Sequence, residues 1–220
     1  MRLSSLGLLL ILGLAGTAGA SAAVVDAEPV NSASIDQSAE LIGQLQQIQT
    51  LTASYIQTTV DNRQQLVQQA RGSVWVSAPG KFRLETNEPS TQTLVSDGET
   101  FWSFDEDLEQ VVVSRLERDI SQVPILLFGG DAEAIADEYL VVYFTEDDHD
   151  FYVLEPREEA SLFESLTLTF VAGEPVSIVL RDSLGQRTQI EFSDLVANQL
   201  IADGTFTFVP PAGVDLIDDR

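Results

Sequence analysis

The chain has 220 residues, no cysteine, and 35 acidic against 11 basic side chains, which gives a net charge of −24. This length suits one domain with a buried core. The lack of cysteine excludes disulfides, thiolate metal sites and acylation at a cysteine, and the negative charge argues against a nucleic-acid partner because phosphate binding needs a cationic surface.

The N-terminus is typical of a cleaved secretory signal. Arg2 is a short basic region, residues 6–15 are apolar, and small residues around Ala20 fit a signal peptidase site. The apolar run is too short for a stable transmembrane helix, so a membrane anchor is the less favoured interpretation. We expect residues 1–22 to be cleaved, residues 23–33 to be disordered, and residues 34–220 to form a single exported domain.

The acidic excess has two interpretations. Lys81 is the single lysine, the other ten basic residues are arginines, and loss of Arg2 with the signal changes the net charge from −24 to −25. Because the acids are spread along the chain, we favour a surface adapted to high salt, where screening weakens self-repulsion. The alternative is an electrostatic docking surface for a basic partner.

A long amphipathic helix is predicted to open the domain. Ser34 and Gln37 fit a capping box, in which the two side chains satisfy backbone amides of the first turn. From there to about Thr58, apolar side chains recur at helical spacing. This stripe consists of Leu41, Leu45, Ile48, Leu51 and Tyr55. The simplest interpretation is a helix that packs on a core.

Residues 63–113 predict four or five antiparallel strands. Short β-prone runs alternate with turns at Pro79-Gly80, Pro89 and Asp97-Gly98. The last of these is a strong hairpin signal, since Asp and Gly tolerate the positive φ of tight turns. Aromatic side chains are frequent in these runs, which favours a curved sheet that binds something apolar.

A short second helix is predicted after a connection over residues 116–121. Pro124 suits a first helical turn, and Gly129-Gly130 suits its end. The four residues between are all large and apolar, so this element must cover an apolar surface or be covered itself.

The remaining sequence predicts a meander of strands. The expected strands are residues 141–144, 151–154, 166–170, 176–181, 188–192 and 205–208. Alternation of polar and apolar side chains in residues 166–170 predicts one wet and one buried face. Long antiparallel meanders hide their edges by curling into a barrel, whose opening helices can cover.

Catalytic and metal sites are not favoured by the acidic stretches. His149, the only histidine, lies within the acidic residues 146–150, and no nucleophile-elbow sequence accompanies it. The same stretch lacks the spacing and glycine of an EF-hand. Asp105 and Asp107 fit paired glycosidase carboxylates less well than an acidic turn. We expect no enzyme activity, no metal and no cofactor.

The chain resembles the periplasmic outer-membrane lipoprotein carrier family, LolA. The matching segments run in order through nearly the whole chain after the leader: residues 75–85, 94–98 with Trp102, 108–111, Pro124 with 126–127, 151–156, 182–186 and 206–214. No single motif is unique to the family, but the ordered set is specific. The resemblance implies a mainly β fold with some α, namely an incomplete antiparallel β-barrel with an α-helical lid over a hydrophobic cavity.

The resemblance also implies a soluble periplasmic monomer and a function. Such carriers accept an acylated lipoprotein from an inner-membrane ATP-driven release complex and pass it to an outer-membrane lipoprotein receptor. The acyl cavity would be lined by Trp75, Phe82, Leu84, Trp102, Phe104, Val111, Val113, Phe170, Ile178 and Phe192. The lid would contain Leu41, Leu45, Ile48, Ile125, Leu126, Leu127 and Phe128, with residues 131–137 as a further turn.

One position departs from the family. In the better-known carriers a basic residue directly before the proline of this segment bonds to the lid and holds it closed, and here that position is Ala78. Arg71, Lys81 or Arg83 could replace that latch, or all three are ordinary surface cations. Phe82 matches an aromatic at the barrel mouth.

Two other functions are less favoured. A periplasmic lipoprotein sensor or regulator of the same fold is the first alternative. Such relatives normally carry an additional domain, for which the 220 residues leave no room. A carboxylate-based hydrolase is the second, and it lacks an evident catalytic geometry.

Overall fold

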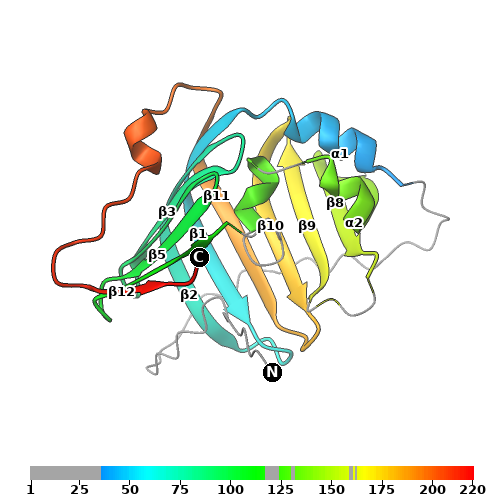
Figure 1. The fold of residues 1–220 in the computed structure, drawn as a ribbon. Coiled ribbons are helices and arrows are strands. Elements are labelled where there is room, and N and C mark those ends of the chain that lie inside the picture. Colours follow the sequence, from blue (N-terminus) through cyan, green and yellow to red (C-terminus); the bar gives the residue numbers. More distant parts are fainter. Residues whose placement is uncertain (1–35, 117–123, 130–131, 159–160, 162) are drawn as a thin grey trace. The chain divides into compact units, whose positions relative to one another are not determined.

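A computed structural model describes residues 36–116, 124–129, 132–158, 161 and 163–220 (Figure 1). These residues belong to one compact unit, Ile35–Arg220. The predictions for the signal and for residues 23–33, as well as Ser34 of the capping box, lie outside the described residues.

One curved sheet makes up most of the described chain. Its twelve strands follow the order β12-β6-β5-β4-β3-β2-β1-β11-β10-β9-β8-β7. Their bounds are β1 (Thr50–Val60), β2 (Leu66–Ser77), β3 (Lys81–Glu88), β4 (Gln92–Asp97), β5 (Thr100–Asp105), β6 (Gln110–Arg115), β7 (Tyr139–Glu146), β8 (His149–Pro156), β9 (Phe163–Val171), β10 (Glu174–Asp182), β11 (Arg187–Ala197) and β12 (Asp215–Asp218). Only the β12–β6 pair is parallel among these strands. The two end strands of this order, β12 and β7, do not pair, so the barrel is incomplete, as predicted.

The predicted turns form through local side-chain bonds. The Asp97 carboxylate accepts the amides of Glu99 and Thr100 at 2.9 and 2.8 Å, and Gly98 has φ +102°. Between the expected strands 176–181 and 188–192, Asp182 likewise accepts the amides of Leu184 and Gln186 at 2.9 and 2.8 Å. Short polar side chains that hydrogen-bond to the backbone fix such hairpins, which explains why the turns were predictable from the sequence.

Four short helical elements accompany the sheet in the described ranges. They are α1 (Ser38–Leu45), the 3-10 helix η1 (Pro124–Phe128), α2 (Ala134–Glu138) and the 3-10 helix η2 (Asp203–Phe206). Figure 1 shows α1 and α2 together over β8 and β9, whereas η2 lies on the other side of the sheet. The predicted helix at residues 124–128 is confirmed, and α2 covers most of the further turn expected over residues 131–137.

The prediction of one long first helix is wrong over its second half. α1 ends at Leu45, and β1 starts at Thr50 and pairs with both β2 and β11. Leu51 and Tyr55 fit helical spacing, but they also alternate with Ala53 on one buried face of a strand. Four Thr residues together with Tyr55, Ile56 and Val60 favour the strand. At the start of α1, Gln37 makes no side-chain cap, and the Asp36 carboxylate accepts the Ser38 amide at 3.0 Å instead.

The C-terminal region differs from the predicted meander. Five of the six expected strands are present as β7 to β11, but residues 205–208 are not a strand: they enter η2 and an extended segment. Phe206 is buried, and the Phe208 ring centroid lies 5.9 Å from that of Phe104, so these aromatics pack on the sheet without joining it. The edge strand β12 was missed because its four residues are all exposed and carry no burial pattern.

Candidate functional site

An apolar floor covers one face of the sheet, which we call the inner face. Val76 on β2 lies opposite Leu51 on β1 and Phe82 on β3. In the half of the sheet formed by β8, β9 and β10, on the same face, Leu168 lies opposite Tyr152 and Ile178. These side chains are at most 2 % exposed. The floor thus extends across both halves of the open barrel.

Helical segments cover this floor. The cover, as we use the term, consists of α1 with Ile48, η1 and α2. Its apolar side chains are 0–6 % exposed: Leu41, Leu45, Ile48, Ile125, Leu126, Leu127, Phe128 and Ile135. The Phe128 ring meets Phe192 of β11 edge-on at 5.8 Å. All residues predicted for the lid therefore lie in the cover and pack inward.

A tyrosine on the floor contacts the cover through its hydroxyl. Tyr152 donates to Oε1 of Gln44 on α1 at 3.4 Å. Burial raises the pKa of Tyr152 to about 12, so the hydroxyl keeps its proton at neutral pH. The contact is long for a hydrogen bond, which makes it a weak attachment between floor and cover.

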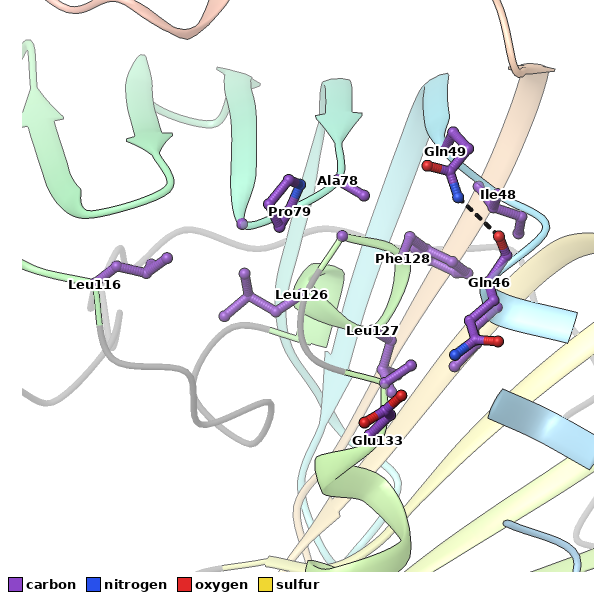
Figure 2. Close-up of a pocket in the computed structure, with 14 residues that line it drawn as sticks. Gln46, Ile48, Gln49, Ala78, Pro79, Leu116, Leu126, Leu127, Phe128 and Glu133 are labelled. Atoms are coloured by element: carbon purple, nitrogen blue, oxygen red, sulfur yellow. Dashed lines mark hydrogen bonds between the residues drawn. The ribbon is translucent and has the colours of Figure 1, made fainter. Parts of the chain in front are cut away.

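A pocket of about 370 Å³ lies at one edge of the cover (Figure 2). Figure 2 shows Ala78 and Pro79 of the β2–β3 turn beside Ile48 and Gln49, with Leu127 of η1 below them. The complete lining is Leu45, Gln46, Ile48, Gln49, Ala78, Pro79, Gly80, Leu116, Leu126, Leu127, Phe128, Gly129, Ala132 and Glu133. Most of this lining is apolar, so the cover leaves an opening with apolar walls where its segments meet the turn.

The register divides the ten predicted cavity residues between the two faces. Phe82 and Leu84 of β3 alternate with Arg83, and Phe82 faces the floor. Phe170, Ile178 and Phe192 also lie on the inner face, with Phe170 and Ile178 fully buried. Five members of the predicted set thus lie on the side that the cover occupies.

The other five lie on the outer face, which corrects their assignment to the cavity. Trp75 lies opposite Arg83, and Arg83 opposite Val95. Successive strand residues point to opposite faces, so this row cannot share a face with Phe82. The corrected residues are Trp75, Trp102, Phe104, Val111 and Val113. They pack instead where residues of the C-terminal segment such as Phe206 and Phe208 cover the outer face.

The three predicted latch cations direct their side chains away from the cover. Arg83 pairs with Glu85 at 2.6 Å and donates to the Thr205 carbonyl at 3.4 Å, on the outer face. Lys81 alternates with Phe82 and lies opposite Asp97, so its side chain belongs to the outer face, although its carbonyl would lie 3.8 Å from a Cβ on Gly129. Arg71 pairs with Glu88 at 3.1 Å, and both side chains are more than half exposed. The structure brings none of these cations to the edge of the pocket.

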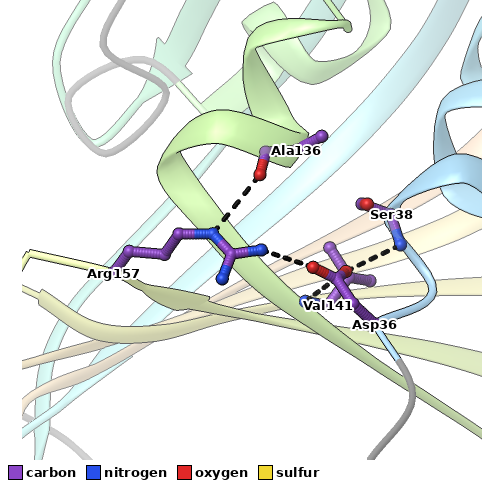
Figure 3. Close-up of polar contacts among 5 residues, drawn as sticks. All are labelled: Asp36, Ser38, Ala136, Val141 and Arg157. Atoms are coloured by element: carbon purple, nitrogen blue, oxygen red, sulfur yellow. Dashed lines mark hydrogen bonds and ion pairs between the residues drawn. The ribbon is translucent and has the colours of Figure 1, made fainter.

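A different cation, Arg157, holds the cover (Figure 3). Its Nη2 pairs with Asp36 at the start of α1, and its Nε donates to the Ala136 carbonyl of α2 at 3.3 Å. Asp36 also accepts the amide of Val141 on β7 at 3.4 Å. Arg157 therefore ties α1 and α2 to the edge of the sheet. No local pattern could reveal this pair, because its partners are 121 residues apart.

The environment of Asp36 favours its charged form. Burial raises the pKa of Asp36, but hydrogen bonds from Ser38, Arg157 and Val141 outweigh that effect, and the pKa lies below its ordinary value of 3.8. The pair is therefore ionised at neutral pH.

The acidic stretches form turns. His149 Nδ1 lies 2.8 Å from the Asp147 carbonyl, and its ring stacks near Phe151. Asp105 accepts the Leu108 amide at 3.0 Å. Among the residues that the structure describes, no cluster of three or more His, Cys, Asp or Glu side chains is arranged to bind a metal ion. No described helix has the length and apolar character needed to span a membrane.

The comparison with known proteins decides the family. The family model described as outer membrane lipoprotein carrier protein LolA matches residues 46–209. The chain belongs to the LolA family. This membership confirms the resemblance found in the sequence, and the matched range contains every strand of this LolA-family chain except β12.

Individual relatives agree with that assignment. The outer-membrane lipoprotein carrier protein of Hahella chejuensis is 38% identical over 210 residues, which are 94% of this chain and 97% of the relative. That of Chromohalobacter salexigens is 39% identical over 173 residues, 79% of this chain and 82% of the relative. A solved structure of an uncharacterized conserved protein from Thermus thermophilus has a TM-score of 0.54 and 12% identity, and the match covers 83% of this chain and 99% of that protein. That likeness supports the fold alone.

Proposed function

We propose that this LolA-family chain carries lipoproteins across the periplasm and that it shields their acyl chains between floor and cover. The observation that carries the proposal is an apolar cover packed on an apolar floor, with every cover side chain named above at most 6 % exposed. The names of the relatives as outer-membrane lipoprotein carrier proteins support the same cargo.

The physical task of such a carrier is solvation. Burial of one CH₂ group is worth about 0.8 kcal/mol, so a single fatty chain exposes on the order of 10 kcal/mol of apolar surface to water. A closed cover hides the floor while the protein is empty. Cargo binds the open state and displaces the cover. No covalent chemistry is needed, and we infer that the chain is not an enzyme.

The proposed acyl site consists of the inner-face members of the predicted set. Phe82, Leu84, Phe170, Ile178 and Phe192 would contact the acyl chains once the cover moves. The cover elements suit such movement because η1 and α2 have only five residues each. Helices of this length are not stable alone and depend on their packing.

The remaining partners follow from the carrier role. We propose an inner-membrane ATP-driven release complex as the source of the cargo and an outer-membrane lipoprotein receptor as its destination. The protein would act as a monomer in the periplasm after removal of residues 1–22. No contact among the described residues favours the alternatives of a lipoprotein sensor or a carboxylate hydrolase.

Transfer from membranes tests the proposal. The purified mature protein is incubated with inner-membrane vesicles that contain the release complex and labelled lipoproteins. We expect soluble one-to-one complexes of carrier and lipoprotein, formed only with ATP. Lipoprotein that stays in the vesicle fraction under these conditions would contradict the carrier role. Vesicles that lack the release complex provide the control.

A further inference from the structure

The β2–β3 turn contacts both the cover and the start of β1 through its main chain. The Ala78 amide donates to the Gln49 carbonyl at 2.9 Å, immediately after Ile48. The Gly80 amide donates to the carbonyl of Gly129, the residue that follows η1. The Gly80 bond thus joins the turn to the end of η1, whereas the Ala78 bond extends by one pair the β1–β2 ladder, in which Thr50 lies opposite Ser77.

Close packing makes this arrangement dependent on glycine. Gly80 has φ +70°, and a Cβ there would lie 3.2 Å from the Cα of Gly98 in the neighbouring turn. A Cβ on Gly129 would lie 2.6 Å from Cγ1 of Val76, on the floor. The β2–β3 turn therefore lies directly between the β4–β5 turn and the end of η1.

A buried serine joins the β2–β3 turn to the β4–β5 turn. Ser96 on β4 is 0 % exposed. Its hydroxyl donates to the Gly80 carbonyl at 2.9 Å and accepts the Gly98 amide at 3.0 Å. Removal of this hydroxyl would leave both groups without their partner in a dry site, where an unsatisfied polar group is costly. Ser96 thus sets the orientation of the residue whose amide holds η1.

We propose that the cover of this chain is held closed at the pocket by the main-chain hydrogen bond from Gly80 to Gly129, and that Ser96 is the positioning residue for this latch. The inference rests on the proposed function, because it takes the cover to be movable. Among the described residues, no lysine or arginine lines the pocket. A latch made of neutral groups depends little on ionic strength, unlike one made by a charged side chain.

Hydrogen exchange with two matched variants tests the latch directly. Ser96→Ala removes the hydroxyl behind Gly80. Thr59→Val removes another buried hydroxyl, which lies 3.0 Å from Thr188 Oγ1 between β1 and β11. Both variants should lose some thermal stability. Only Ser96→Ala should speed exchange of the Gly80 amide, by about fivefold, the effect of one ordinary hydrogen bond.

Entry of an uncharged apolar dye, N-phenyl-1-naphthylamine, reports whether the same change frees the cover. Ser96→Ala should accelerate dye entry relative to Thr59→Val, and by the same factor in dilute and in concentrated salt. Equal Gly80 exchange in the two variants would overturn the latch, even if lipoprotein transfer succeeds. If the Gly80 amide exchanges faster in Ser96→Ala but the wild type forms no complex with lipoprotein, the latch is supported and the carrier role is rejected. Dye entry that rises steeply with salt in Asp36→Asn, which lacks the ion pair with Arg157, would indicate an ionic latch at the pocket instead.

Discussion

Ala78 marks the residue at which this chain differs most informatively from the carriers that it resembles. A basic side chain at this position bonds to the lid in the better-known carriers, according to the resemblance. Here the small side chain lines the pocket, and the Glu133 carboxylate belongs to the same lining. The pocket therefore lies where the basic side chain is missing, and in this chain the turn contacts the cover through the Gly80 main-chain bond.

Replacement of Ala78 by arginine should add an ionic latch to the existing one. We expect Ala78→Arg to slow dye entry and lipoprotein loading severalfold in dilute buffer, because the guanidinium can approach Glu133. High salt should remove part of the effect. Stopped-flow dye binding at two salt concentrations measures it. Ala78→Met fills the pocket without charge, and identical behaviour of the two variants would refute an ionic contribution.

The pair of Asp36 with Arg157 should make stability depend on pH. The pKa of Asp36 is lowered in the folded protein. The ionised carboxylate therefore adds to the free energy of unfolding above the ordinary pKa of 3.8, and this stabilisation is lost as the pH falls through and below that value. Asp36→Asn should cost about 0.5–1 kcal/mol at pH 7, as for other partly exposed pairs. Urea unfolding should show this difference shrink toward pH 3.

A matched variant distinguishes the cover contact from surface charge in general. Glu88→Gln removes the partner of Arg71 in an exposed pair. It should change the free energy of unfolding less than Asp36→Asn does at pH 7. A pH-independent difference between the wild type and Asp36→Asn would show that the carboxylate acts by packing and not by charge.

At the scale of secondary-structure elements, the cover elements differ from the strands in how they are held. Each central strand has two neighbours in the ladder, whereas η1 contacts the sheet through apolar side chains and the Gly80 bond. The floor should therefore remain folded when η1 is displaced.

A charge in η1 should displace the cover without unfolding the sheet. Leu127 is 3 % exposed, and a glutamate there would resist burial. Leu127→Glu should bind the apolar dye more strongly, keep its β-sheet circular dichroism and lose cargo retention. Leu200→Glu is the control, because Leu200 is fully exposed. Loss of cooperative unfolding without a folded dye-binding state would show that η1 is core and not a cover.

A disulfide should lock the cover in the closed position. Val76→Cys with Gly129→Cys places two thiols close together, since a Cβ on Gly129 would lie 2.6 Å from Val76 Cγ1. The chain has no other cysteine to compete. The oxidised variant should not load lipoprotein, and reduction should restore loading. Undiminished loading by the oxidised form would contradict movement of η1.

The sequence predicted most strands and turns, but it could not decide which face each strand presents. Turns at Asp97 and Asp182 carry their own hydrogen bonds, so local residues suffice. Trp75 and Phe82 are both aromatic, and alternation alone does not say which faces the cover. The C-terminal segment makes the outer face apolar as well, through Phe206 and Phe208. That long-range packing, like the pairing of β1 with β11, is invisible in any short window of sequence.

At the scale of the whole molecule, charge dominates the expected response to solvent. The net charge is −24, with a single lysine, so self-repulsion in dilute buffer should be large. The melting temperature should rise as added salt shortens the Debye length from about 30 to about 3 Å. Calorimetry across that range measures the effect. A flat melting temperature would refute adaptation to salt and favour the docking interpretation of the acidic surface.

The unpaired ends of the sheet give the barrel a seam. A closed barrel has a circumference that strand number and stagger fix, and it can widen only if ladder bonds break. In this chain β7 and β12 are not joined, so the wall can spread at the seam while every strand keeps its partners. The open barrel could then become wider between β7 and β12 to accommodate cargo with more or bulkier acyl chains. The range of lipoproteins that the protein accepts would depend on how easily the curved sheet spreads as well as on the shape of the site.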